Sequence, residues 1–368
     1  MTDLLAHFDV LLSDLDGTLY RGPSEVPGAA AAVRGAAARG VRTVYVTNNA
    51  SRRPVDVAAH LSELGFPAVT DDVVASSQAA AALLAQQLPA GAKVLVVGTD
   101  ALAEEVRAVG LEVTDTADDA AAVVQGHSQD TGWRQLAEAT VAVRAGAVWV
   151  ACNLDPTVPT DRGMLPGNGS MVGVVRTATR LEPQVAGKPG PALLLEAARR
   201  SGAQRPLMIG DRLDTDVEGG RAAGMATLLV LTGVSDAAEL LAAPPALRPD
   251  YLDADLAALT KEPDDLVPGP RPDWDVRVVA PGKVVLGGPG GDPVDALRAL
   301  CAAHWAAGGG AVRVAADGPA AAEAVRTLRL GPDTGGNGSA SATVAGAGPG
   351  DGAATSPSRP QPIAGAHP

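Results

Sequence analysis

Short apolar runs recur along the first part of the chain, and several of them end abruptly in polar or acidic residues. Runs of this kind, bounded by turn-forming residues, are typical of buried strands in parallel sheets. The segments 8–12, 41–46 and 207–209 show the pattern, and a helical stretch such as 193–198 follows one of the polar clusters. The alternation predicts an α/β fold, in which ligands bind at the carboxyl ends of the strands.

The first polar cluster lies in LLSDLDGTLYRG at 11–22, where Asp14 and Asp16 follow the apolar run directly. Side chains at i and i+2 of a strand share a face, so both carboxylates can reach one small site. Two carboxylates held close together repel each other unless a cation or a proton lies between them. The motif therefore predicts a metal, a proton shuttle or both, although an Asx turn after a strand explains it equally well when it is taken alone.

Two further clusters supply groups that suit phosphate. Thr47, Asn48 and Asn49 end the run at 41–46, and a hydroxyl with nearby amides can donate to phosphate oxygens. Lys188 precedes a proline and a helical pattern in a chain that otherwise uses Arg for most of its cations. Taken singly, the first cluster also fits a helix cap and Lys188 also fits a solvated surface residue.

The fourth cluster is GDRLDTD at 210–216, which follows the apolar run 207–209. It places Asp211, Asp214 and Asp216 within six residues. Acidic residues also favour the first turn of a helix, so a helix start is the alternative. The segment lacks the later glutamate that an EF-hand loop requires, which excludes that kind of calcium site.

In this order, DLDGT, VTNN, GKP and GDRLDTD resemble the four motifs of the haloacid dehalogenase (HAD) superfamily of aspartate-nucleophile phosphohydrolases, over about residues 8–260. The resemblance implies a Rossmann-like, doubly wound parallel-sheet core. About 140 residues separate Thr47 from Lys188, far more than a βα loop requires. Strand-like runs and a helical stretch at 133–144 fill this interval, which resembles the inserted α/β type-2 cap of the class IIA (NagD- and phosphoglycolate phosphatase-like) group.

The resulting domain organisation has six parts, and we expect the linker among them to limit contact between the core and the region that follows it. The C-terminal region shows strand-like runs and two helical stretches but has no assigned fold, and the tail is poor in apolar residues. The predicted parts are a first core segment at 1–87, the cap at 88–182, a second core segment at 183–260, a linker at 261–273, a small α/β region at 274–330 and a disordered tail at 331–368.

The resemblance implies specific roles for the carboxylates. Asp14 would be the nucleophile that forms an aspartyl-phosphate, and Asp16 would be the general acid and base. Asp14, the backbone carbonyl of Asp16, and Asp211 would bind Mg²⁺, which prefers oxygen ligands.

The remaining motif residues would serve the phosphoryl group. Thr47, Asn48 and Lys188 would hold its oxygens, where negative charge is spread in a loose transition state. Asp216 would orient Lys188 or a metal-bound water. Asp214 receives no role.

The class IIA resemblance implies a phosphomonoesterase acting on small phosphate esters, with glycerol 3-phosphate as the expected substrate. Phosphoglycolate, pyridoxal phosphate and nitrophenyl phosphate are the alternatives, and the loops at 155–164 and 168–170 are expected to set specificity. A non-catalytic binding or regulatory module is less favoured because Asp14 and Asp16 are both present. A phosphomutase remains open, whereas an ion pump would need membrane helices.

Composition narrows the partners and the compartment. The formal net charge of −13 and the pI near 4.8 argue against nucleic acid and anionic membranes. Cys152 and Cys301 lie far apart without a metal or disulfide motif, which favours a reducing cytosol. No signal peptide or long apolar run is present, so we expect a cytoplasmic protein that binds a small phosphorylated metabolite and can form a homo-oligomer through the cap.

Overall fold

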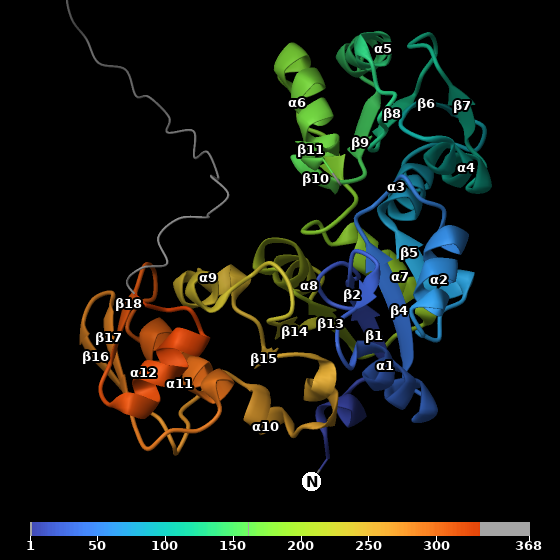
Figure 1. The fold of residues 1–368 in the computed structure, drawn as a ribbon. Helices are drawn as coiled ribbons and strands as arrows, with labels where there is room; N and C mark the ends of the chain where they lie inside the picture. Colours follow the sequence, from blue (N-terminus) through green and yellow to red (C-terminus); the bar gives the residue numbers. More distant parts are fainter. Residues whose placement is uncertain (1, 161, 332–368) are drawn as a thin grey trace, which may run out of the picture. The chain divides into compact units, whose positions relative to one another are not determined.

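A six-stranded parallel sheet forms the centre of the fold in the computed structural model, which describes residues 2–160 and 162–331 (Figure 1). Its strand order is β15-β14-β13-β1-β4-β5, so chain order reverses between β1 and β13. This is the doubly wound Rossmann-like arrangement, and the predicted α/β class is confirmed. The strands are β1 (Val10–Ser13), β4 (Arg42–Thr47), β5 (Val73–Ala75), β13 (Pro206–Gly210), β14 (Ala226–Val230) and β15 (Tyr251–Asp253).

Helices cover both faces of this sheet because its strands are apolar on both faces. Successive residues of a strand point to opposite faces. Leu11, Tyr45 and Ile209 therefore enter one core cluster, while Leu12, Val46 and Met208 enter a second. The helices of this part are α1 (Ala29–Ala38), α2 (Pro54–Glu63), α3 (Ser76–Ala85), α7 (Ala192–Ser201), α8 (Glu218–Ala222) and α9 (Ala237–Ala242), and a short hairpin β2 (Tyr20–Arg21) and β3 (Ser24–Glu25) follows β1.

A second parallel sheet is inserted between α3 and α7, as the spacing of the motifs predicted. Its order is β12-β9-β8-β6-β7, and an antiparallel hairpin of β10 and β11 accompanies it. We call residues 93–185 the insert. Its elements are β6 (Lys93–Val97), α4 (Asp100–Ala108), β7 (Glu112–Thr114), β8 (Ala122–Gln125), α5 (Trp133–Arg144), β9 (Val148–Ala151), β10 (Thr157–Thr160), β11 (Gly163–Pro166), α6 (Asn168–Thr179) and β12 (Gln184–Val185).

The two chain segments that lead into and out of the insert lie side by side. Helices α3 and α7 pack against each other. Just beyond α3, the Gln87 side-chain amide donates to Gln184 Oε1 at 3.0 Å, and Gln184 donates to Gln87 Oε1 at 2.9 Å. This reciprocal amide pair joins the beginning and the end of the insert.

A three-stranded sheet with two helices forms the C-terminal region, whose secondary structure follows the sequence pattern. A short helix, α10, lies in the predicted linker. The elements are α10 (Pro263–Leu266), β16 (Asp275–Ala280), β17 (Lys283–Gly287), α11 (Pro293–Ala306), β18 (Arg313–Ala316) and α12 (Pro319–Thr327).

The expectation that the linker limits contact with the core is wrong. Leu286, Leu297 and Leu300 share one buried cluster with Leu240 and Leu252 of the core. These contacts arise because β14, β15 and α9 present an apolar face at the sheet edge, and α11 covers it.

Buried polar contacts fix the same junction. Arg298 is 2% exposed, and its guanidinium donates to the Leu252 carbonyl at 2.6 Å and to Asp253 Oδ1 at 3.0 Å. The Trp305 indole N–H donates to the Leu241 carbonyl at 3.1 Å. A buried guanidinium with charged and carbonyl partners is costly to disrupt, so this junction is a structural interface and not a flexible connection.

The predicted tail at 331–368 lies, beyond Gly331, outside the described residues. Within the part of the chain that the structure describes, no helix combines the length and apolar character needed to span a membrane.

Candidate active site

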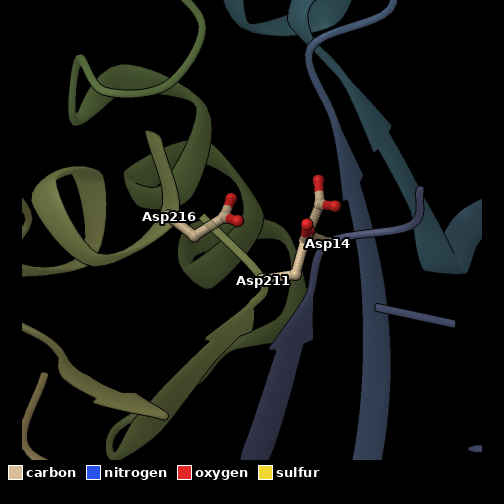
Figure 2. Close-up of side chains that lie close together, drawn as sticks. All are labelled: Asp14, Asp211 and Asp216. Carbon is tan, nitrogen blue, oxygen red and sulfur yellow. The ribbon is translucent and has the colours of Figure 1, made fainter. Parts of the chain in front are cut away.

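Three carboxylates from two motifs meet where chain order reverses in the central sheet. Asp14 follows β1 and Asp211 follows β13, and these strands pair in register, with Ser13 opposite Ile209. Asp216 lies in a π-helical turn over Leu213–Val217. One oxygen from each of the three carboxylates lies within 4.8 Å of the others, and Figure 2 shows how the side chains approach. Such a reversal point is where open α/β sheets bind ligands.

Lys188 lies inside this group of carboxylates. Its ammonium is 2.5 Å from Asp14 Oδ1 and 2.7 Å from Asp216 Oδ1. Lys188 is 2% exposed and Asp216 is 1% exposed. A buried ammonium needs such partners because the cost of removing it from water is high. The structure thus joins the first, third and fourth motifs in one cluster.

Asn48 clamps the backbone of Lys188. Its side-chain amide donates to the Lys188 carbonyl at 2.9 Å, and its side-chain oxygen accepts the Lys188 N–H at 2.8 Å. Thr47 precedes it at the end of β4, and its hydroxyl oxygen accepts the Asn49 N–H at 3.1 Å. The second motif therefore adjoins the third, with the Asn48 side chain engaged by the Lys188 backbone.

Asp211 is held by two donors and by a close backbone approach. Thr18 Oγ1 donates to Oδ1 at 3.3 Å, and the Val234 N–H donates to Oδ2 at 2.7 Å. Gly17 has a φ of +88°, and a Cβ on it would lie 2.5 Å from Asp211 Oδ2. The glycine of DLDGT is thus required both for its backbone conformation and for this approach. The Thr232 hydroxyl fixes the same turn by donating to the Gly17 carbonyl at 2.6 Å.

The electrostatics of the cluster favour an added cation. Burial raises the pKa of Asp14, the negative charges of Asp216 and Asp211 raise it further, and Lys188 opposes them. Burial also raises the pKa of Asp211 to about 6, with Asp216 raising it and the Val234 N–H lowering it. The Lys188 ammonium pairs with Asp14 and Asp216, and Asp211 adds a third carboxylate beside them, so negative charge is in excess. All the donor atoms are carboxylate oxygens, which suits a hard divalent ion.

Asp16 lies apart from that group. It is exposed and forms an isolated bridge with Tyr20 at the start of the β2–β3 hairpin. Although the residue as a whole is exposed, partial desolvation of its carboxyl group raises the pKa of that group, while the Gly22 N–H, Arg52 and His60 lower it. This position leaves the Asp16 carboxyl accessible to a molecule that enters from solvent.

One supporting residue, Asn153, had no signal in the sequence. Asn153, at the end of β9 in the insert, donates to the Asn48 carbonyl at 2.7 Å. Burial raises the pKa of the half-buried Asp155, which Arg212 and Lys188 oppose. Asp155, in the loop expected to set specificity, thus interacts electrostatically with Lys188 of the site. Asp214, to which we assign no role, forms a bidentate pair with Arg212.

Comparison with known proteins gives the same ordering of parts. A family model for haloacid dehalogenase-like hydrolases matches residues 11–112, and a second HAD-like hydrolase model matches 185–259. A model for a GCN5-related N-acetyltransferase-like domain matches 271–330, the region to which the sequence alone assigned no fold.

Named relatives match most of the chain. The D-glycerol 3-phosphate phosphatase of Mycobacterium tuberculosis is 49% identical over 316 residues, covering 83% of this chain and 88% of that protein. An acid sugar phosphatase of Staphylococcus saprophyticus is 34% identical and covers 70% of this chain and 99% of that protein. The crystal structure of the M. tuberculosis glycerol phosphate phosphatase with magnesium aligns with a TM-score of 0.83 at 48% identity, over 90% of this chain and 99% of that one.

Three observations indicate the same family: the order of the motifs, the position of the site where chain order reverses in the sheet, and these matches. The chain belongs to the haloacid dehalogenase-like hydrolase family.

Proposed function

We propose that this protein is a magnesium-dependent phosphomonoesterase that hydrolyses glycerol 3-phosphate to glycerol and phosphate. The observation that carries the activity is the buried Lys188 ammonium between Asp14 and Asp216, with Asp211 beside them. The names of the relatives, which include a D-glycerol 3-phosphate phosphatase and an acid sugar phosphatase, support this class of ester.

The residues present fit a magnesium ion. Asp14, Asp211 and the backbone carbonyl of Asp16 would hold it, and burial together with the neighbouring carboxylates raises the pKa values of both carboxyl groups. When bound, the ion would neutralise charge on the phosphoryl oxygens. The magnesium complex of the M. tuberculosis relative supports this choice of metal.

Asp14 and Asp16 then carry out the two steps of the reaction. A carboxylate oxygen of Asp14 attacks phosphorus in line, the P–O ester bond breaks, and the leaving alkoxide takes a proton from Asp16. Asp16, now a carboxylate, removes a proton from a water molecule that attacks the aspartyl-phosphate. Phosphate leaves, and the Asp14 carboxylate and the Asp16 proton are restored.

Lys188 and Thr47 are the groups we assign to the phosphoryl oxygens. The ammonium already lies at the nucleophile, where it can match charge developing on phosphate. Because the Asn48 side chain is occupied by the Lys188 backbone, its contribution is to position that lysine. Asp216 shares the ammonium and orients it.

Asp16→Asn is expected to affect substrates according to their leaving group. For glycerol 3-phosphate, whose alkoxide needs a proton, kcat/KM is expected to fall about 100-fold or more. For nitrophenyl phosphate the first-step loss should be at least about tenfold smaller, because nitrophenolate leaves without protonation. Steady-state kinetics with both esters measure the difference, and equal losses would rule out Asp16 as the acid.

Magnesium activation is expected to weaken at acidic pH. A raised pKa keeps Asp211 protonated below about pH 6, so a proton competes with the metal there. The half-saturating magnesium concentration should therefore rise by at least about tenfold for each pH unit below that point, because burial also raises the pKa of the second ligand, Asp14. Magnesium titrations of activity between pH 5 and 8 measure this, and a flat dependence would contradict the assignment of Asp211 as a ligand.

A panel of phosphate esters tests the substrate. Glycerol 3-phosphate is expected to give the highest kcat/KM among glycerol 3-phosphate, phosphoglycolate, pyridoxal phosphate and nitrophenyl phosphate, since a site that hydrogen-bonds the free hydroxyls discriminates against esters without them. A higher value for phosphoglycolate would overturn the substrate and keep the phosphatase. Inactivity toward every ester would favour the non-catalytic module instead.

We further infer that the protein acts in the cytoplasm on a free metabolite and that any homo-oligomer forms through the insert. The acidic net charge supports a free metabolite over nucleic acid or an anionic membrane, and Trp133 of the insert, 84% exposed, supports the insert as a contact surface. Size-exclusion chromatography with light scattering on the wild-type protein and on the Trp133→Ser variant tests whether an oligomer forms through this exposed residue of the insert.

A further inference from the structure

A chain of hydrogen bonds connects the insert with the nucleophile. It begins at Asn168, the first residue of α6, whose side-chain amide donates to the Asn153 carbonyl at 2.7 Å. The Asn153 amide in turn donates to the Asn48 carbonyl at 2.7 Å. The Asn48 side chain binds both the backbone N–H and the backbone carbonyl of Lys188, and the Lys188 ammonium contacts Asp14.

Within this series of hydrogen bonds, Asn153 is the residue of the insert that contacts the core. It is 4% exposed, and its side-chain oxygen accepts the Asp155 N–H at 3.2 Å while its amide points to Asn48. Both ends of the side chain are thus engaged, which fixes its rotamer. A buried amide held in this way transmits position well because breaking either bond leaves a polar group unpaired.

The Asn48 carbonyl receives a second donor from the core side. Ser76, at the start of α3, donates its hydroxyl at 2.6 Å. The loop after β4 is therefore held between a core helix and the insert. Asn48 begins this loop directly after Thr47, the last residue of β4. The position of Asn48 therefore affects the Thr47 hydroxyl and, through the Lys188 backbone, the Lys188 ammonium.

We propose that Asn153 is a positioning residue of the reaction, which holds the loop at Thr47 and Asn48 and, through Asn48, the ammonium of Lys188. The inference rests on the proposed phosphatase activity. It assigns Asn153 to the phosphoryl end of the substrate and not to its leaving group. Loss of the Asn153 donor therefore weakens binding of any phosphoryl group and slows its transfer.

The test uses the full chain with Asn153→Asp, which keeps the acceptor for Asp155 and removes the donor to Asn48. Asn153→Ala removes the donor without adding charge. Both variants are expected to raise the inhibition constant of inorganic phosphate by about tenfold, and to lower kcat/KM by at least about tenfold, because small misplacements of catalytic groups have large effects on rate. The loss should be the same factor for glycerol 3-phosphate and nitrophenyl phosphate.

Thr177→Ala provides the matched control. Its hydroxyl is in α6 of the same insert and donates to the Gly173 carbonyl of that helix. This variant should keep wild-type kinetics. Thermal melting of all three variants separates a loss of folded protein from a change in the folded enzyme.

Several outcomes would overturn the inference. An unchanged phosphate inhibition constant in folded Asn153 variants would make Asn153 merely structural, as would failure of both to fold. Unequal losses for the two esters would assign Asn153 to leaving-group recognition. A wild-type enzyme that hydrolyses neither ester would instead refute the proposed function, so the two failures are distinguishable.

Discussion

Asp14→Asn is expected to lower kcat/KM for every phosphate ester by at least about 10³-fold. Loss of an essential catalytic group removes several kcal/mol of transition-state stabilisation. The amide has nearly the same shape as the carboxylate but lacks its nucleophilic oxygen. Lys188 keeps its second partner, Asp216, at 2.7 Å, so the cluster retains an ion pair. The loss should therefore appear in the chemistry and not in the fold.

Steady-state kinetics and thermal melting measure these two effects separately. Asp214→Asn is the matched control, because Asp214 lies in the same acidic motif and its carboxylate pairs with Arg212 at the surface. It should keep activity close to that of wild type. Acid quenching with a phosphorus-labelled ester should trap label on wild-type protein and none on Asp14→Asn. Residual activity within tenfold of wild type would rule out the aspartyl-phosphate route.

A chain ending at Glu262 is expected to lose most of its stability. The truncation uncovers Leu229, Leu240, Leu241 and Leu252, which α11 and its neighbours bury. Uncovering one such side chain costs about 1.5–3 kcal/mol, so the group together approaches the whole stability of a typical domain. We therefore expect aggregation on expression or a strongly lowered melting temperature.

A chain ending at Gly331 is the control for this truncation. It keeps the C-terminal sheet, α11 and the Arg298 contacts with Leu252 and Asp253. It should melt and turn over substrate like the full chain, because the removed residues, 332–368, are poor in apolar side chains. If the chain ending at Glu262 is soluble and melts within a few degrees of the full chain, the buried junction contributes little.

The central sheet and its carboxylates could be predicted because they depend on local patterns. An apolar run that ends in Asp14, or in Asp211, signals a parallel strand with a polar carboxyl end. The rarity of lysine made Lys188 conspicuous in the same way. Parallel strands then bring their ends together without further information from the sequence.

The contacts that support the site could not be predicted, because they join residues far apart in the chain. Nothing near Asn153 indicates that its amide meets Asn48, and nothing near Arg298 distinguishes it from a surface arginine of an amphipathic helix. The proline-rich stretch before Trp274 looked like a linker because composition reports local flexibility and not what a later helix covers.

The reciprocal amide pair of Gln87 and Gln184 has a consequence for engineering. Because the two junctions of the insert are neighbours, replacing everything between them leaves the core with two adjacent ends and adds little loop-closure entropy. The insert of a relative could be grafted at these positions to exchange one ester preference for another. The graft would need an amide donor in the place of Asn153, since otherwise the transplanted insert would leave the Asn48 carbonyl without its partner from that side.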